Sequence, residues 1–362
     1  MTRPLVIGAG LAGSASAIGL ARAGAPPLLV ERAHETGDAI CGGFLSWQTL
    51  ATLDRLGLDT AALGGQCVTK LRLFAGKRAL EAPLPRPGMG LSRKRLDTLL
   101  LAEAERLGTA VERGVMVRRV DSGMALTSDG AILSGDTIML GVGKHGLPNQ
   151  PRPAPAKVAA DPVIGLRLRI AASPAGPRLV GEAVELFLFD RGYAGLVRQE
   201  DGSINLCLAV HKSRLGEAQS RPETLIAQWC EENRHLGDRL ASGDPVGPID
   251  AIASVPYGWR TQGTEPGLWR LGDQAACIPS RAGEGMGIAL ASAESAVAAW
   301  RHGEGAVSWQ QRFSDRLALP MGVARMAWAA AENPHWNATA VALLARAPWL
   351  LDRLARATRV PA

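Results

Sequence analysis

The feature that most constrains this chain is a glycine turn near its N-terminus. In "PLVIGAGLAGSASAIGLARAG", an apolar run at residues 5–7 leads into Gly8, Gly10 and Gly13, and a helical pattern follows. Glycines at this spacing between a strand and a helix are typical of dinucleotide binding: the first permits a tight turn, the second lets backbone approach a pyrophosphate, and the third allows close helix packing. The helix N-terminus supplies unpaired N–H groups and the positive end of its dipole. We therefore predict an α/β nucleotide domain at the start of the chain, with a glycine turn that binds nothing as the alternative.

A carboxylate stands where such a domain needs one. "PPLLVER" is predicted to be the second strand of a βαβ unit, and it reaches Glu31 eighteen positions after Gly13. A carboxylate at this point can accept hydrogen bonds from a ribose diol. It also argues against a 2′-phosphate at this site, because two anions would then meet.

The remaining sequence changes in character near residue 150. Before it, Ser46 and Ser92 are predicted helix N-caps, with a β-hairpin in "VTKLRLFAGKRALEAPL" between them and a buried strand at residues 137–140. After five prolines in "PNQPRPAPAKVAADP", alternating runs predict an antiparallel sheet with a hairpin turn at residues 201–202. Helical patterns return at "PETLIAQWCEEN" and over the last sixty residues.

Composition excludes several classes of protein. With 47% hydrophobic and 20% charged residues the chain is a folded globular protein, and its net charge of +6 comes without a basic run interleaved with aromatics, which argues against nucleic acid. The five cysteines show no CxxC or Cys/His spacing, so we expect reduced thiols and no metal site. The N-terminus lacks a secretion signal, which predicts a cytoplasmic protein. Arg325 and Arg346 interrupt the late apolar stretches, so no transmembrane segment is expected.

A second glycine-rich motif lies far along the chain. In "RLGDQAACIPSRAGEGMG", Gly272 and Asp273 follow a predicted strand, and Gly283, Gly285 and Gly287 open a helix. This segment resembles the second FAD motif of the flavoprotein superfamily that contains p-hydroxybenzoate hydroxylase and the geranylgeranyl reductases. The resemblance implies that the aspartate binds the ribityl and pyrophosphate region and that the helix start faces the flavin ring. A helix N-terminus there stabilises the negative charge of reduced flavin.

Other segments resemble the same family, so the resemblance covers most of residues 3 to 300. "LSRKRLD" is similar to the segment whose arginine lies over the FAD phosphates, "MLGVGKHG" to a strand end, "ASVPYGW" to the strand that leads into the second motif, and "GYAGLVRQEDGSINLCLAV" to the substrate-domain sheet. The resemblance implies an FAD site made of Gly8, Gly10, Gly13, Glu31, Arg32, Cys41, Gly42, Gly43, Arg93, Gly143, Gly272, Asp273, Pro279, Gly283, Gly285, Met286 and Gly287.

Cys41 is the candidate catalytic residue. "AICGGFLSW" resembles the "CGGxxS" segment of geranylgeranyl reductases, whose cysteine lies near the flavin ring. By that resemblance Cys41 faces the flavin, and Gly42 and Gly43 let the chain pass close to it. A thiol in this position either packs against the ring or assists protonation of a reduced carbon.

Three departures from the family bear on function. The Asp-Gly pair of the aromatic hydroxylases is replaced by Gly143-Lys144-His145, and the WxWxIP motif of the halogenases is absent. Arg281 stands where relatives often carry an aromatic residue, and there it meets a substrate anion or nicotinamide phosphate, or else is a solvated loop charge. Tyr193 and Trp259 either line the substrate cavity or pack in the core.

The predicted architecture is an α/β protein with a Rossmann-like FAD-binding domain of the glutathione reductase type 2, p-hydroxybenzoate hydroxylase-like kind. We expect this domain at residues 1–150 plus 260–300. An inserted antiparallel-sheet substrate domain is expected at 151–259, with contributions from about 68–90, and a helical region at 301–362. The helical region has eight arginines against four carboxylates, so it is either a solvated cap or a peripheral contact with a lipid surface.

The predicted function is FAD-dependent redox chemistry on a hydrophobic small molecule of isoprenoid or polyketide type, with NAD(P)H as the electron donor. A reductase that transfers hydride from reduced flavin is favoured by Cys41 and "GVGKHG". The alternatives are a flavin monooxygenase that hydroxylates an aromatic or polyketide substrate, and a carrier that binds a nucleotide or prenyl group without catalysis.

Overall fold

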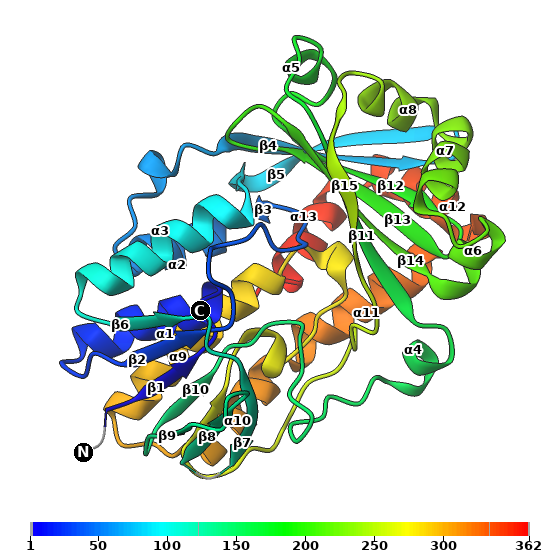
Figure 1. Cartoon of the computed structure of the whole chain (residues 1–362). Helices are drawn as coiled ribbons and strands as arrows, with labels where there is room; N and C mark the ends of the chain where they lie inside the picture. The colour runs from blue at the N-terminus through cyan, green and yellow to red at the C-terminus, as the bar shows by residue number, and fades with distance from the viewer. Residues whose placement is uncertain (1–2, 122, 333, 361–362) are drawn as a thin grey trace.

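A five-stranded parallel sheet forms one half of the molecule (Figure 1). The computed structural model describes residues 3–121, 123–332 and 334–360. In spatial order the strands are β16 (Leu268–Arg270), β10 (Ile138–Leu140), β1 (Leu5–Ile7), β2 (Leu28–Glu31) and β6 (Ala110–Arg113). Every neighbouring pair is parallel, so all the carboxyl ends lie along one edge. The sheet is complete only when β16 returns from the second half of the chain.

Alternating side chains bury both faces of this sheet. Val6, Leu29 and Met139 pack against three helices: α1 (Leu11–Arg22), α3 (Arg93–Arg106) and α9 (Gly285–Arg301). Leu5 and Ile7 point the other way, toward a small antiparallel sheet of β7 (Val117–Asp121), β8 (Met124–Thr127) and β9 (Ile132–Ser134). Because strand side chains alternate between faces, a strand of only three residues serves two cores.

The second sheet has eight strands. Their spatial order is β15 (Pro245–Ile252), β11 (Val163–Ile170), β14 (Ile204–His211), β13 (Gly192–Arg198), β12 (Ala183–Phe189), β4 (Gln66–Ala75), β5 (Arg78–Gly90) and β3 (Phe44–Leu45). The pairing is antiparallel as predicted, except that β12 and β4 are parallel. The exception arises where the β4–β5 hairpin, from the first quarter of the chain, joins strands from its middle.

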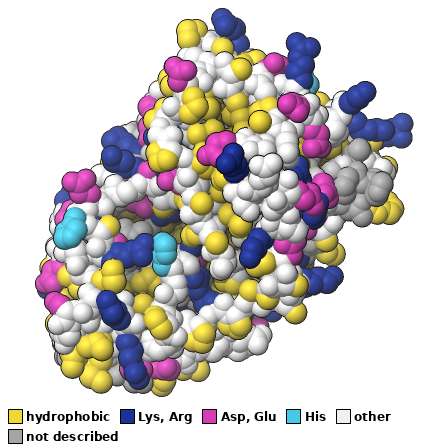
Figure 2. All heavy atoms as spheres, turned by 45° about the vertical axis from the view of Figure 1, so that its right-hand side comes forward, with side chains coloured by type: hydrophobic (Ala, Val, Ile, Leu, Met, Phe, Trp, Pro, Cys, Tyr) yellow, Lys and Arg dark blue, Asp and Glu magenta, His cyan; other side chains and the backbone are white. Residues whose placement is uncertain are grey.

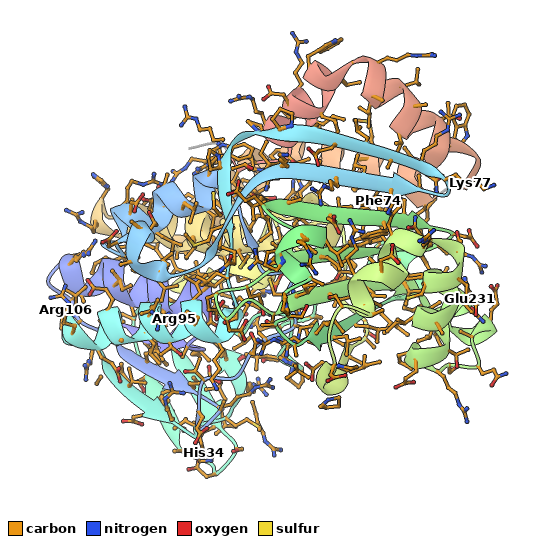
Figure 3. The ribbon with its side chains drawn as sticks, turned by 90° about the horizontal axis from the view of Figure 1, so that it is seen from above. His34, Phe74, Lys77, Arg95, Arg106 and Glu231 are labelled. Atoms are coloured by element: carbon orange, nitrogen blue, oxygen red, sulfur yellow. The ribbon has the colours of Figure 1, made fainter. Side chains whose placement is uncertain are left out.

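Helices cover both faces of the large sheet. On one face α7 (Pro222–Glu232) and α8 (Arg234–Leu240) pack, with Phe189 stacked on Trp229 at 4.4 Å and Phe74 stacked on Phe187 at 4.4 Å. Figure 3 shows Phe74 on β4, with Lys77 at the tip of the β4–β5 hairpin. Against the other face lie α11 (Ala318–Glu332), α12 (Pro334–Arg346) and α13 (Pro348–Ala357). The C-terminal helices therefore cap the large sheet.

The shorter helices connect these layers. They are α2 (Trp47–Arg55), α4 (Ala156–Ala160), α5 (Gly176–Leu179), α6 (Lys212–Glu217) and α10 (Ala306–Arg316). The predicted caps are confirmed, since the Ser46 hydroxyl accepts a hydrogen bond from Thr49 N at the start of α2 and the Ser92 hydroxyl accepts one from Arg95 N at the start of α3. None of the helices formed by described residues is long and apolar enough to cross a bilayer.

The assignment of "ASVPYGW" to a strand is wrong. Residues 253–259 form turns, because Ser254 and Gly258 have positive φ angles of 59° and 85° and Pro256 lies between them. The strand that leads into the second glycine motif is β16, which ends at Arg270. A 3₁₀ turn at Gly272–Gln274 follows it.

The close contact between α1 and the first glycine turn yields a test of the fold. A Cβ added to Gly13 would overlap the carbonyl oxygen of Gly8. We expect Gly13→Ala to lower the free energy of unfolding by about 1–3 kcal/mol, the usual cost of overpacking. Gly322→Ala is the matched control, because Gly322 also lies in a helix but has open space around it. Chemical denaturation measures both, and equal stabilities would contradict the assigned contact.

Candidate active site

A cavity of about 920 Å³ lies between the carboxyl edge of the parallel sheet and the large sheet. Its nucleotide end is lined by residues that follow β1, β2 and β10, and its far end by residues of β11, β13, β14 and β15. Figure 2 shows a hollow with Lys, Arg and His side chains on its rim. The basic side chains that line the cavity are Arg32, Arg93, Arg113, Arg118, Lys144 and His145. One continuous space thus joins the two halves of the molecule.

The first glycine turn forms one wall. Gly8 has φ of 98°, and a Cβ there would come within 2.6 Å of the Gly141 oxygen, so only glycine fits. No side chain caps α1, whose N-cap residue is Gly10. The Glu31 carboxylate accepts hydrogen bonds from Ala9 N at 2.7 Å and Ala33 N at 2.9 Å. The predicted carboxylate therefore lies at the turn.

Three other glycines show whether FAD fits. Gly10, Gly42 and Gly285 line the cavity, and none has a positive φ angle. An added Cβ would meet nothing within 4 Å at Gly42 and Gly285, and only the end of the Arg93 side chain at Gly10. The protein itself does not require glycine at these positions, whereas a ligand lying against the backbone does. The donor-rich turns, the uncapped helix start and these bare backbones fit a bound FAD.

Arg93 is held at the same wall. Its guanidinium donates to both Asp97 carboxylate oxygens, at 3.0 and 2.8 Å, in a bidentate ion pair. Although burial acts to lower it, the neighbouring Asp97 keeps the pKa of Arg93 above its ordinary value. The arginine is a fixed cation beside Gly10, whose added Cβ would lie 3.5 Å from Arg93 Nη2.

The segment that carries Cys41 has no regular structure, and side chains from other elements hold it. Each carbonyl of residues 39–42 accepts a hydrogen bond: Ala39 from Arg167 at 3.3 Å, Ile40 from Lys144 at 2.9 Å, and Cys41 and Gly42 from Asn205 at 3.0 Å each. Gly43 has φ of 73° and packs beside Gln199, where a Cβ would be crowded at 3.0 Å. Cys41 therefore lines the cavity from a loop whose carbonyls at residues 39–42 all accept hydrogen bonds.

The far wall carries groups that stay protonated. Cys207 Sγ donates to the Cys41 carbonyl at 2.9 Å, and burial raises the pKa of this thiol to about 12. Burial likewise raises the pKa of the Tyr193 and Tyr257 phenols above the ordinary tyrosine value. At neutral pH this wall therefore presents uncharged O–H and S–H groups.

Other predicted residues lie off the wall. Four of them do not line the cavity: Gly13 in α1, Gly287 in α9, Pro279 and Trp259. Arg281 is not a solvated loop charge: its side chain is 8% exposed, with the guanidinium carbon 5.0 Å from the Tyr193 ring centre and 4.6 Å from that of Trp328. Burial lowers its pKa, and Glu332 is 3.8 Å away. The remaining predicted cofactor residues all line the cavity.

Sequence reasoning missed Asn205, Cys207 and Arg167. All three lie on strands of the large sheet and reach the Cys41 segment from more than a hundred positions away. In "INLCLAVH" the residues Asn205 and Cys207 alternate with leucines, which places them together on one face of β14. That alternation was the available signal, but it does not say what the face meets.

This arrangement defines a dinucleotide-binding flavoprotein fold with a substrate sheet, and known proteins agree with it. A family described as an FAD binding domain matches residues 1–126. The menaquinone reductase of Mycolicibacterium smegmatis is 26% identical over 345 residues, covering 89% of this chain and 82% of that protein. A putative 2-heptyl-3-hydroxy-4(1H)-quinolone synthase of Rhodococcus erythropolis is 32% identical over 145 residues, 38% of each chain. The structure of the flavin-dependent brominase Bmp2 superimposes with a TM-score of 0.77 at 15% identity, covering 99% of this chain and 94% of that one.

The chain is an FAD-dependent oxidoreductase with a Rossmann-like FAD-binding fold, which agrees with the flavoprotein resemblance of its two glycine motifs. The predicted fold class and the predicted FAD cofactor are thereby confirmed.

The bare glycines of the cavity yield a prediction. We expect Gly10→Ala to weaken FAD binding at least tenfold, about 1.4 kcal/mol, because the new methyl group takes space that the ligand uses. The thermal midpoint of the FAD-free protein should stay unchanged, since the methyl meets no backbone. Gly263→Ala, at an equally open position away from the cavity, is the control. Fluorescence titration with FAD measures affinity, and unchanged affinity would show that this backbone does not contact the cofactor.

Proposed function

We propose that this chain is an FAD-dependent reductase of a hydrophobic small molecule of isoprenoid or polyketide type, with NAD(P)H as the electron donor. The observation that carries the proposal is the single cavity, which runs from the glycine turns to a wall containing Leu208, Ile252 and Tyr257. The similarity to menaquinone reductases, which extends over 89% of the chain, supports a reductase with a hydrophobic substrate.

When bound, FAD supplies two-electron redox chemistry, with hydride transfer from its reduced form. The residues that would hold it fall into two groups, one at each glycine motif: Gly8, Gly10, Glu31, Arg32 and Arg93 at the first, and Cys41, Gly42, Gly43, Gly143, Gly272, Asp273, Gly283, Gly285 and Met286 at the second and beside it. The start of α9, which no side-chain hydrogen bond caps, contributes free N–H groups at the second motif.

Saturation of a carbon–carbon double bond also needs a proton, and this chain has two thiols at the cavity. The Cys207 proton is already engaged by the Cys41 carbonyl, at 2.9 Å. The Cys41 thiol is partly exposed and lines the cavity. We assign Cys41 as the group that donates the proton to the substrate carbon.

The reductase proposal is tested by anaerobic turnover. We expect purified protein to be yellow, to be bleached by NADH or NADPH without oxygen, and to convert menaquinone to a product two hydrogen atoms heavier. Mass spectrometry of the quinone measures this outcome. Oxygen consumption coupled to NAD(P)H oxidation, with a hydroxylated product, would instead establish a monooxygenase. Protein that is colourless and cannot be loaded with FAD would exclude both flavoenzymes and favour a carrier that binds a nucleotide or prenyl group without catalysis.

A substitution separates the chemical role of Cys41 from packing. We expect Cys41→Ala to keep its FAD and to lose at least about a hundredfold in turnover, the lower range for a missing general acid. Cys67→Ala is the matched control, because Cys67 is exposed on β4 and does not line the cavity. Steady-state kinetics with flavin content measured for each variant gives the answer, and full turnover by Cys41→Ala would show that the thiol only packs.

A further inference from the structure

The end of the chain reaches back into the second FAD motif. Arg359 lies beyond α13, yet its guanidinium donates to the Ala282 carbonyl at 3.1 Å and to the Gly283 carbonyl at 3.3 Å. It also pairs with the Glu284 carboxylate, and Val360 N donates to the same carboxylate at 3.4 Å. Figure 1 shows α13, in red, in the middle of the molecule, where it packs against β5. Three consecutive residues of the motif are thus bonded to Arg359 and Val360, directly after α13.

The Glu284 carboxylate is buried and therefore requires a counter-charge. The residue is 1% exposed and is the N-cap of α9. Its carboxylate folds back over the first turn of the helix, in the space that a Cβ at Gly287 would occupy. The Ser46 hydroxyl at the start of α2 donates to it at 3.4 Å. A buried carboxylate needs a counter-charge, and Arg359 is the cation within ion-pair distance of it among the described residues.

Arg359 is equally enclosed. Its side chain is 7% exposed, and its guanidinium carbon lies 5.4 Å from the centre of the Trp47 ring. The cation therefore lies between α2 and the loop at residues 280–285. Ser280, Gly283 and Gly285 of that loop line the cavity.

We propose that Arg359 is a positioning residue for the cofactor: the C-terminal residues fix the loop at 280–285, and the enzyme retains FAD only when this end of the chain is in place. The proposal rests on FAD occupying the cavity and is independent of which substrate is reduced. Loss of Arg359 leaves two loop carbonyls without their donor and a buried carboxylate without its counter-charge. The backbone that lines the cavity then shifts.

The test uses full-length Arg359→Gln with Arg356→Gln as the matched control. Arg356 lies one turn earlier, 53% exposed, and pairs only with the exposed Asp352 among the described side chains. We expect Arg359→Gln to bind FAD at least tenfold more weakly in fluorescence titration, and to shift the visible spectrum of the FAD it retains. Arg356→Gln should match the parent. Affinity and spectrum of folded Arg359→Gln within twofold of the parent overturn the proposal.

A second variant excludes a merely structural role. Glu284→Gln/Arg359→Gln removes both buried charges, so we expect it to recover much of the thermal stability lost in Arg359→Gln. Its FAD affinity should stay weak, because the Ala282 and Gly283 carbonyls still lack the guanidinium. Recovery of parental affinity together with stability overturns positioning. If the parent protein binds FAD but does not reduce quinone, the proposed reductase activity is wrong, while the proposed role of Arg359 in FAD binding is unaffected.

Discussion

Four backbone carbonyls hold the two halves of this protein together. The carbonyls of residues 39–42 belong to no strand or helix, and their hydrogen bonds come from Arg167 and Asn205 on the large sheet and from Lys144 beyond the parallel sheet. Arg167 also pairs with Asp38 at 2.8 Å and with Asp250 at 2.6 Å. Moving one sheet relative to the other would break several of these hydrogen bonds and the Arg167 ion pairs at once. The cavity therefore keeps one shape from its nucleotide end to its substrate end.

Glycine has two different uses around this cavity. Gly8 and Gly13 are needed by the protein, since any side chain would collide with neighbouring backbone. Gly10 and Gly42 meet no such obstacle, but both line the cavity, where a backbone without a side chain lets a ligand approach closely. The first glycine motif thus contains two residues whose bare backbone the fold requires, Gly8 and Gly13, and one, Gly10, that the fold does not require to be glycine.

Local features were predictable from the sequence, and long-range ones were not. The caps at Ser46 and Ser92 and the β4–β5 hairpin depend on neighbouring residues, so pattern alone located them. The ion pair of Glu284 with Arg359 joins residues 75 positions apart, and no periodicity marks it. For the same reason the sequence predicted that Cys41 faces the flavin but did not predict which side chains donate hydrogen bonds to the carbonyls of residues 39–42. Glycine motifs can be recognised in the sequence because their residues are close together. The side chains that hold such a segment in place come from distant parts of the chain, so the sequence does not show which ones they are.

The charges around the cavity favour an uncharged substrate. At the far wall Asp250 is neutralised by Arg167, and the phenols of Tyr193 and Tyr257 keep their protons. Arg281, the cation nearest these rings among the described residues, lies behind Tyr193 and is off the cavity wall. An anionic substrate would have to lose its hydration at this wall without meeting a counter-charge, which is unfavourable. A neutral, largely apolar molecule with a carbonyl or hydroxyl oxygen loses little there and gains hydrogen bonds from the phenols. The neutralised Asp250 and the uncharged phenols of the far wall contrast with the basic side chains at the other end, so the two ends of one cavity offer different environments.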